Sequence, residues 1–322
     1  MRIESAMIPL LVGGLGLGLY ATQIEPYRHV LRRVQVSVPP HWPRLSLLHL
    51  SDPHVKNGRD RLYRSQERFL RALPDVPDLV CVTGDVCERL VDVPRLVALL
   101  GVLSPRTETI VVLGNHEHGM RAPHGWPDQP DSIWEWLAKL ANLLIGSPLN
   151  SSGVQEGHAI ADALTASGVR VLMNQGVRLH LGHGSLWVAG IDSTWSDCAR
   201  VAPAMQGRRA GEACLGLVHE PEGAIELVEQ GATLALAGHT HGGQVKFPLL
   251  GAPVTLRTDD RILVACGLQR LGDGMLHISA GLGHSTTLRF NCPPEATWID
   301  CIPDAGGHAA NASPATLALA AR

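Results

Sequence analysis

The chain has 322 residues, of which 45% are hydrophobic and 18% are charged. This composition excludes a disordered chain, and the length suits one large folded domain or two small ones. The net charge of −3 gives no overall reason to bind nucleic acid, so we expect no nucleic-acid partner. The sixteen histidines instead point to metals, because imidazole is the commonest metal ligand in proteins.

The N-terminal segment, residues 1–33, carries no charged residue between Ala6 and Ile24. We expect an apolar helix here, since nineteen uncharged residues come close to the roughly 20 that span a membrane. The helix could span the membrane or lie on it; a cleaved signal peptide and a buried core helix are the alternatives. Arginines 28, 32 and 33 follow the apolar run. The positive-inside rule therefore predicts a membrane-associated protein whose main domain faces the cytoplasm.

The seven cysteines agree with that compartment. Their number is odd, no CxxC pair occurs, and Cys81, Cys214 and Cys266 lie inside apolar runs. A thiol in such a run usually behaves as a small hydrophobic group. We therefore expect all seven cysteines to be reduced, as is usual in the cytoplasm.

The main domain is predicted over residues 44–302, and its first part alternates strands with helices. Strands are predicted at 45–50, 78–83 and 109–113, and helices at 59–73 and 92–102. This alternation is typical of an α/β sandwich. Later strands are predicted at 169–173, 177–181, 185–190, 213–218 and 233–237, with more after residue 244. The tail, residues 303–322, is small and polar and is expected to be flexible.

Residues 118–157 are expected to form a helical insertion in this domain. A loop-like stretch precedes Asp131, which is a good N-cap for a helix with Trp136, Leu140 and Leu144 on one face. The helix could simply pack on the domain. It could also be an apolar lid or a membrane-contacting element, because amphipathic helices that contain tryptophan suit interfaces.

Polar side chains follow the predicted strands at the points where the strands end. They are Asp52 and His54, then Asp85, then Asn115, His116 and Glu117, then His219, and finally His239 and His241. The carboxyl ends of strands form the ligand-binding edge of an α/β sheet. We therefore expect these side chains to meet at one edge.

Carboxylate and imidazole ligands in this pattern suit zinc, manganese or iron. Asp52 and His54 are separated by one residue, so an extended backbone can present both to the same side. About seven such ligands are too many for one ion and fit two ions that share a bridging carboxylate. Asp85 is the natural bridge, because it stands alone at the end of a central strand.

The ordered set "SDPH", "TGDV", "LGNHE", His219 and "AGHTHGGQ" resembles the signature of the calcineurin-like metallophosphoesterases, and the resemblance extends over residues 46–300. It implies an α/β fold with a four-layer α/β/β/α sandwich and two divalent metal ions (Mn, Fe or Zn). It further implies that Asp52, His54, Asp85 and His241 hold one ion. Asp85, Asn115, His219 and His239 would hold the other, and His116 would be the catalytic histidine.

Three further stretches resemble a membrane-associated subgroup of that family: "IEP" at 24–26, "GHTHGGQ" at 238–244 and "GLGHSTTLRFNCPPE" at 281–295. The subgroup includes phosphodiesterases and a UDP-2,3-diacylglucosamine pyrophosphatase of lipid A synthesis. The resemblance therefore implies hydrolysis of a phosphoester, and it makes a lipid phosphoester one of the expected substrates. Glu220 departs from the subgroup pattern, where asparagine is frequent beside the ligand.

The stretch 56–71 contains six lysine and arginine residues against Asp60 and Glu67. It could form a basic rim for a diphosphate or for anionic headgroups, or it could be a solvated helix face. The best expectation is a phosphodiesterase or pyrophosphatase acting on a membrane-associated substrate. A phosphodiesterase for other lipids or nucleotides is the main alternative, and a non-catalytic membrane scaffold or a nuclease is less expected.

Overall fold

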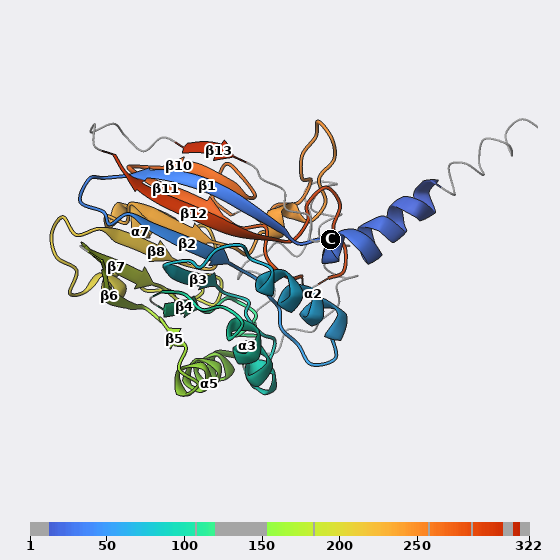
Figure 1. Cartoon of the computed structure of the whole chain (residues 1–322), viewed down its shortest axis with the longest axis horizontal. Coiled ribbons are helices and arrows are strands. Elements are labelled where there is room, and N and C mark those ends of the chain that lie inside the picture. The colour runs from blue at the N-terminus through green and yellow to red at the C-terminus, as the bar shows by residue number, and fades with distance from the viewer. Residues whose placement is uncertain are drawn as a thin grey trace, which may run out of the picture.

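A computed structural model describes residues 13–106, 108–119, 153–182, 184–256, 258–284, 286–304 and 312–315. In these ranges the chain forms two β-sheets (Figure 1). The first sheet has the spatial order β13 (Ala312–Ala315), β1 (Val30–Val38), β12 (Glu295–Pro303), β2 (Leu45–Leu50), β3 (Leu79–Thr83), β4 (Glu108–Val112) and β5 (Arg170–Val171). The second has the order β10 (Gly267–Leu271), β11 (Gly274–Ile278), β9 (Leu234–Ala237), β8 (Cys214–Leu217), β7 (Gly184–Gly190) and β6 (Gln175–Leu181).

Four neighbouring strands of each sheet run parallel. In the first sheet β2, β3, β4 and β5 pair in parallel, with Leu47 opposite Leu79 and Cys81 opposite Ile110. In the second sheet β7, β8, β9 and β11 are parallel, while β6 and β10 are antiparallel neighbours at its two edges. Parallel pairing matters for the site, because it brings the carboxyl ends of neighbouring strands to one edge of each sheet.

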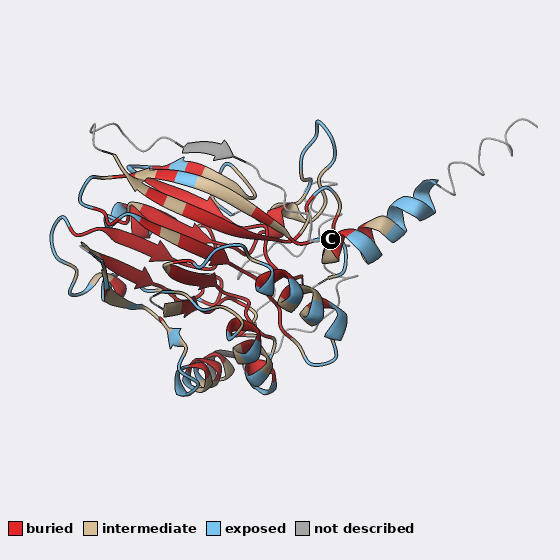
Figure 2. Cartoon of the chain, viewed as in Figure 1, coloured by how far each residue is buried: buried red, intermediate tan, exposed pale blue. Residues whose placement is uncertain are grey.

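Side chains that alternate along each strand separate the molecule into layers. Leu47 and Leu79 point between the two sheets, where they pack with Leu215 and Leu236 of the second sheet. Their neighbours Leu48 and Val80 point the other way. Both faces of these strands are therefore buried, as the red strands in Figure 2 show, and this explains their almost continuous apolar sequences.

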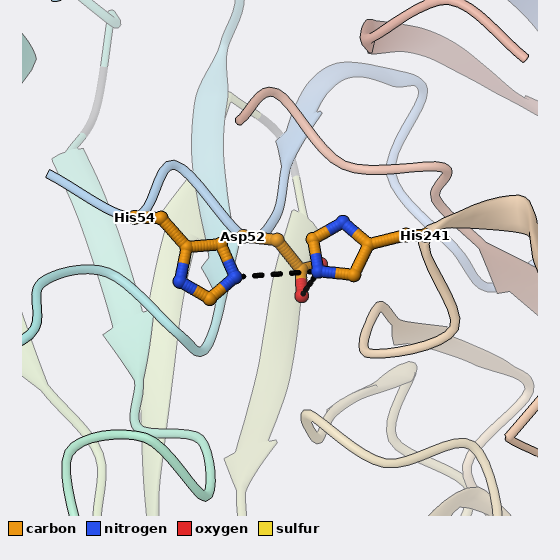
Figure 3. Close-up of side chains that lie close together, drawn as sticks. All are labelled: Asp52, His54 and His241. Carbon is orange, nitrogen blue, oxygen red and sulfur yellow. Dashed lines mark hydrogen bonds and ion pairs between the residues drawn. The ribbon is translucent and has the colours of Figure 1, made fainter. Parts of the chain in front are cut away.

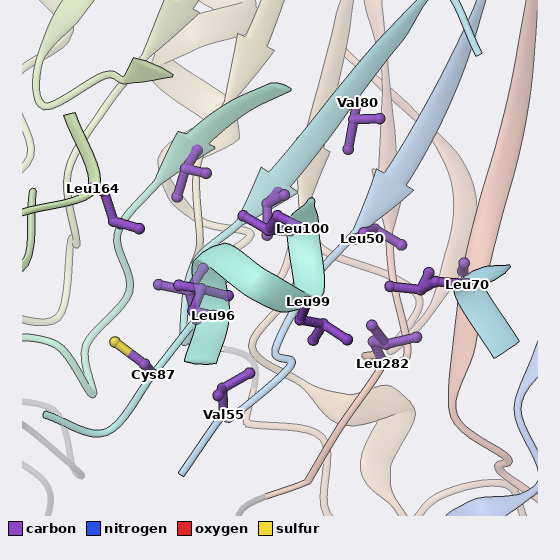
Figure 4. Packing of buried hydrophobic residues seen from close by; sticks show 14 of the residues in the cluster. Leu50, Val55, Leu70, Val80, Cys87, Leu96, Leu99, Leu100, Leu164 and Leu282 are labelled. Atoms are coloured by element: carbon purple, nitrogen blue, oxygen red, sulfur yellow. The ribbon is translucent and has the colours of Figure 1, made fainter. Parts of the chain in front are cut away.

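Helices cover the outer face of each sheet. Helices α2 (Asp60–Arg71), α3 (Val93–Leu100) and α5 (Gly153–Ala166) cover the first sheet, and Figure 4 shows their leucines packed on Leu50 and Val80. The short helices α6 (Val201–Met205) and α7 (Gly223–Glu229) cover the second sheet. The layer order is thus helix, sheet, sheet, helix. It agrees with the predicted four-layer arrangement, and each predicted strand boundary lies within two residues of the observed one.

The N-terminal part of the described chain is helical. Residues 13–19 form an exposed α-helix, which continues through a π-helical turn, η1 (Tyr20–Ile24), and a 3-10 turn, η2 (Glu25–Tyr27). Among the described residues, no helix is both long enough and apolar enough to cross a membrane. The predicted apolar membrane helix is therefore not supported by this structure, and its residues 6–12 lie outside the described ranges.

The predicted N-terminal segment and the predicted C-terminal tail both contain residues of observed strands. Strand β1 starts at Val30, so residues 30–33, which we assigned to the N-terminal segment, begin a strand of the main sheet. Strand β13 lies inside the predicted tail. Both strands lack a strong sequence signal, because β1 carries arginines and β13 is only four residues long.

The predicted insertion at 118–157 is described only at its two ends. Residues 120–152, which include the predicted helix that follows Asp131, lie outside the described ranges. Helix α5 starts at Gly153, inside the predicted insertion, and buries Ile160 and Leu164 against the first sheet. The last residues of the predicted insertion thus begin a helix of the sandwich itself.

Candidate metal centre

Five parallel strands end at the same side of the molecule and position every predicted site residue. Asp52 and His54 follow β2, Asp85 follows β3, Asn115 and His116 follow β4, His219 follows β8, and His239 and His241 follow β9. All are buried except His116, whose side chain is 14% exposed. Residues that are up to 189 positions apart in sequence are therefore collected into one buried, polar cluster.

The first group of potential ligands contains Asp52, His54 and His241. Their ligand atoms lie within 4.8 Å of one another. Figure 3 shows the two imidazoles facing each other beside the carboxylate, with 3.2 Å between the Nε2 atoms and 3.5 Å from His241 Nε2 to Asp52 Oδ1. Within the described part of the chain, Asp52 Oδ1 has no hydrogen-bond partner although it is buried. A buried carboxylate oxygen of this kind suits a cation.

The second group contains Asp85, His219 and His239, again within 4.8 Å of one another. His219 Nε2 lies 3.2 Å from Asp85 Oδ1 and 3.3 Å from His239 Nδ1. On its other side, His219 Nδ1 contacts the carbonyl oxygen of Thr83 at 2.8 Å. This carbonyl fixes the ring orientation and leaves Nε2 for a ligand, as is usual for metal-binding histidines.

Asp85 lies between the two groups. Its Oδ2 atom is 3.6 Å from His54 Nε2 in the first group, while its Oδ1 atom contacts His219 in the second. One carboxylate therefore faces ligands of both groups. The assignment of Asp85 as the bridge stays a prediction, and this geometry is compatible with it.

The charge state of the cluster suits cations. Burial lowers the pKa of His239 and of His241 well below the ordinary value, so both rings are neutral, which is the form that binds metals. Burial opposes ionisation of Asp85, yet His219 and His116 hold the pKa of that carboxyl well below its usual range. Burial opposes protonation of His219, yet Asp85 raises the pKa of this histidine well above its ordinary value. A proton on His219 therefore occupies a place for which a metal ion would compete.

Two glycines allow the strand ends to come close together. A Cβ atom on Gly238, the first residue of "GHTHGG", would lie 1.7 Å from Ser51 Oγ and 2.5 Å from Asp52 Oδ2. A Cβ atom on Gly114 would lie 2.4 Å from Asp85 Oδ1. Any other residue at either position would push the ends of the strands apart, so the glycines of these motifs have a packing reason.

Asn115 and His116 approach the cluster from the turn after β4. The backbone N–H of His116 donates to Asp85 Oδ1 at 3.0 Å, and a Cβ atom on Gly114 would meet the same oxygen. The His116 ring packs edge-on against His54, with 4.7 Å between ring centroids. Although burial opposes it, the charge of Asp85 and a hydrogen bond with Glu88 raise the pKa of His116 to about 9. His116 thus carries a proton at the partly open side of the cluster.

Glu88 is a site residue that the sequence did not reveal to us. Its Oε1 atom lies 3.3 Å from His54 Nδ1 and 3.5 Å from His116 Nδ1, so one carboxylate faces both rings. The two histidines hold the pKa of Glu88 well below its ordinary value despite burial. The sequence feature that could have indicated Glu88 is its position three residues after Asp85. A carboxylate so close to a predicted ligand at a strand end can reach the side chains around that ligand.

Two more buried glutamates hold the loops in place. Glu117 accepts hydrogen bonds from the backbone N–H groups of Gly114, Asp85 and Cys87 at 2.7, 3.1 and 3.0 Å, which ties the β3 and β4 loops together. Glu220 accepts hydrogen bonds from the Ser193 hydroxyl at 2.5 Å and from the Thr194 backbone at 2.9 Å. Glu220, which stands where the subgroup often has asparagine, is thus held by its own hydrogen bonds and does not displace the neighbouring His219.

The subgroup stretches at 24–26 and 281–295 meet behind His241. Arg289 is fully buried, and its Nη2 atom donates to the carbonyls of Ala280 and Gly283 at 2.8 and 2.7 Å and lies 3.3 Å from His241 Nδ1. Glu25 accepts a hydrogen bond from the backbone N–H of Cys292 at 2.5 Å. The N-terminal helical segment is therefore attached to the loop that supports a predicted metal ligand.

Comparison with known proteins identifies the class to which this fold and this cluster belong. The model of the calcineurin-like phosphoesterase family matches residues 45–243, and the chain belongs to that family. It is a metal-dependent phosphoester hydrolase, as the resemblance implied. The family typically binds divalent metals, in agreement with the two ligand groups.

Three relatives illustrate the range of similar proteins. Phosphodiesterase YaeI of Escherichia coli is 30% identical over 150 residues, which are 47% of this chain and 54% of that protein. A "transmembrane protein with metallophosphoesterase domain" of Bos taurus is 27% identical and is matched over 66% of this chain and 43% of its own length. UDP-2,3-diacylglucosamine pyrophosphatase LpxG of Chlamydia trachomatis is 22% identical, over 93% of this chain and 97% of that protein.

Proposed function

We propose that this protein uses two divalent metal ions to hydrolyse a phosphodiester or pyrophosphate bond in a membrane-associated substrate. The observation that carries the two-metal part is the pair of buried ligand groups, Asp52 with His54 and His241, and Asp85 with His219 and His239. Asp85 faces both groups, and Asn115 follows β4 directly before His116, whose backbone N–H donates to Asp85. We assign Asp85 as the bridge and Asn115 as a neutral ligand of the second ion.

The residues fit such ions. Two buried carboxylates stand among imidazoles of which His239 and His241 are neutral, and buried atoms such as Asp52 Oδ1 and His239 Nε2 have no hydrogen-bond partner in the described chain. When bound, divalent ions neutralise phosphate oxygens and lower the pKa of water so that hydroxide is available near neutral pH. Manganese, iron and zinc all suit this mixed nitrogen and oxygen ligand set.

His116 is assigned as the catalytic acid. It is the predicted site histidine whose side chain reaches solvent, and Asp85 and Glu88 favour its protonated form. In the reaction His116 would donate its proton to the leaving oxygen and then recover it from solvent. General acid catalysis of this kind contributes about 10²- to 10⁴-fold to the rate.

For the substrate, we propose an amphiphile such as UDP-2,3-diacylglucosamine. The name and nearly full-length match of the Chlamydia relative support this choice, as do the apolar N-terminal segment and the exposed arginines of α2. The alternative is a phosphodiesterase for other lipids or for nucleotides, which the name of the Escherichia coli relative supports. We further propose membrane association with the catalytic domain in the cytoplasm, on the basis of arginines 28, 32 and 33 and the transmembrane relative.

The direct test is incubation of the purified, manganese-loaded full chain with UDP-2,3-diacylglucosamine and detection of released UMP. Release of UMP supports the proposal. If only bis-p-nitrophenyl phosphate is hydrolysed, the hydrolase assignment stands and the substrate assignment is wrong.

A variant separates the role of His116 from that of the metal ligands. We expect His116→Ala to keep the metal content of the wild type, measured by elemental analysis, and to lower kcat by about 10²- to 10⁴-fold. His180→Ala, which changes an exposed histidine of β6, serves as the control and should behave as wild type. Loss of metal with unchanged kcat per bound ion would contradict the assignment of His116.

A further inference from the structure

We propose that the apolar turn, residues Phe247–Leu250, inserts into the surface of an anionic lipid bilayer beside the metal centre. This inference rests on the proposed function and adds a second membrane contact to the N-terminal segment. Leu249 and Leu250 are 106% and 84% exposed, and Phe247 is 46% exposed. Large apolar side chains exposed side by side on a folded surface mark interaction sites.

The turn is a defined structure and holds its leucines outward. Phe247 and Gly251 exchange two backbone hydrogen bonds of 2.8 and 2.9 Å, which close a tight hairpin. Leu249 has a φ of 68°, a left-handed conformation in which glycine or asparagine would be less strained. Leu249 thus occupies a backbone conformation that disfavours leucine, and its exposed side chain gains no packing in return. This combination argues for a function of the side chain itself.

Backbone hydrogen bonds connect the apolar turn, through residues 289–290, to the C-terminal end of the N-terminal helix. Lys246 N–H donates to the Phe290 carbonyl at 2.8 Å, and Phe290 N–H donates to the Gln244 carbonyl at 2.9 Å. On the other side of that segment, Arg289 N–H donates to the Ala21 carbonyl at 2.9 Å. Three segments therefore lie side by side, and Figures 1 and 2 show the exposed orange loop and the exposed blue helix at the same end of the molecule.

Exposed apolar side chains continue across these segments. Leu288, which directly precedes the segment that contacts both the turn and the helix, is 44% exposed, and Ile24, Leu19, Leu17 and Leu15 are exposed along the helix. Together with the apolar turn, these side chains provide more exposed apolar surface than a single isolated hydrophobic residue would. Because it includes a projecting turn and a projecting helix rather than a closed groove, a deformable lipid surface suits it better than a rigid partner.

The charges beside this surface complement anionic headgroups. Helix α2 carries four arginines against Asp60 and Glu67, and Arg61, Arg64 and Arg68 are exposed. Arg61 is attached to the root of the helix, because it stacks on Tyr27 with its Cζ atom 3.9 Å from the ring centroid and donates to Gln23 Oε1 at 2.9 Å. Basic groups at the edge of an apolar surface are the arrangement that binds anionic membranes.

The position of the apolar turn indicates how the substrate reaches the metals. Leu249 follows the predicted ligand His241 by eight residues, so it can lie at most about 29 Å from it. A turn seated in the headgroup layer would therefore keep His241 within about 29 Å of that layer. The class of substrate is then a phosphoester whose acyl chains remain in the bilayer while its phosphate group enters the site.

The test compares full-length wild type with Leu249→Ser/Leu250→Ser on vesicles of equimolar phosphatidylcholine and phosphatidylglycerol. We expect the vesicle-bound fraction in sedimentation to fall and the apparent affinity to decrease at least tenfold, because two leucines no longer leave water. Val76→Ser is the control: Val76 is 48% exposed but precedes β3, at the opposite end of that strand from the site. This variant should bind as wild type.

A local measurement keeps the apolar turn separate from the N-terminal helix. Vesicles should slow amide hydrogen exchange in peptides covering 247–251 of the wild type. Unchanged exchange there, or wild-type affinity of the double variant, would overturn the proposal. Turnover of soluble bis-p-nitrophenyl phosphate should be the same in wild type and double variant. If the wild type itself lacks this activity, the proposed hydrolase function fails, whereas the membrane contact is still judged by sedimentation and exchange.

Discussion

At the scale of single residues, the site is marked by unusual backbone geometry. Asp52, His54, Asp85, His239 and His241 all have φ between 46° and 69°, in the left-handed region that most residues avoid. Aspartate and histidine tolerate this region better than apolar residues, but each such residue still costs free energy. The backbone at Asp52 and His54 is therefore not extended, in contrast to the geometry that their spacing suggested. Five of the eleven non-glycine residues with positive φ in the described chain are predicted ligands, and strain of this kind recurs at functional centres.

Glu88 provides a prediction at the same scale. Because its carboxylate faces Nδ1 of both His54 and His116, Glu88→Gln would remove the charge that orients one predicted ligand and the predicted acid. We expect kcat to fall about tenfold or more, with KM nearly unchanged, as happens when the outer partners of metal ligands are altered. The measurement is steady-state kinetics at saturating metal on bis-p-nitrophenyl phosphate.

The matched control is Glu229→Gln. Glu229 is an exposed residue at the end of α7 that pairs with Arg261, far from the predicted ligands in the fold. It should keep wild-type kcat. Wild-type activity in Glu88→Gln would mean that the two histidines hold their orientation without the Glu88 charge.

The predicted site residues could be found from the sequence because each follows a strongly apolar strand. Asp52, Asp85 and Asn115 stand where such runs stop, and parallel strands bring those stops together. Glu88 and Arg289 could not be assigned in the same way. Glu88 acts through two rings contributed by different loops, and Arg289 acts through backbone carbonyls that only the folded loop brings within reach.

At the scale of elements, the same reasoning explains which strands were predictable. Strands β2, β3, β8 and β9 are buried on both faces and therefore read as apolar runs. Strand β1 has Arg32 and Arg33 among its residues because its place near the edge of the sheet leaves part of it exposed. Strand β1 pairs in parallel with β12, which lies far away in sequence, and no local sequence pattern predicts such a pairing.

An ion pair that joins β6 to the loop before β8 gives a pH prediction. Arg178 donates through Nε and Nη2 to Glu212 at 2.5 and 3.0 Å, and this lowers the pKa of Glu212 from 4.5 to about 2. A carboxyl whose pKa is lower in the folded state contributes stability above its unfolded pKa, and loses it as the pH falls through the folded value. The contribution should thus be complete near neutral pH and disappear between about pH 4.5 and pH 2.

The check is urea unfolding of wild type and Glu212→Gln at several pH values. The urea midpoint of the variant should be lower at neutral pH, and the gap to wild type should close as the pH decreases toward 2. Using the difference between the two proteins removes the effect of other acid-sensitive groups. A gap that stays constant with pH would show that the loss comes from altered packing and not from the charge of Glu212.

At the scale of the whole molecule, the predicted metal centre is also a link between the two sheets. Each ligand group takes residues from both: Asp52 and His54 from the first sheet meet His241 from the second, and Asp85 meets His219 and His239. Apart from the apolar layer between the sheets, this cluster is where their carboxyl edges meet. Metal ions bound here would hold the sheets together at the end where two carboxylates and several rings are otherwise crowded.

Metal removal is therefore expected to lower the stability of the whole fold. An ion that binds the folded chain at a hundredfold excess over its Kd adds about 2.7 kcal/mol to the free energy of unfolding, if it does not bind the unfolded chain. For a chain of this size the corresponding decrease in Tm on chelation is roughly 4 °C for each such ion. Calorimetry of the metal-loaded protein with and without EDTA measures this decrease in Tm, with elemental analysis to establish that the ions have left.

Two variants serve as comparisons. His239→Asn should show a smaller decrease in Tm, because one ion has lost a ligand, while His180→Asn should show the full decrease. If EDTA removes the ions and Tm stays the same, the centre does not link the sheets, and the stability of the sandwich rests on its apolar layers alone.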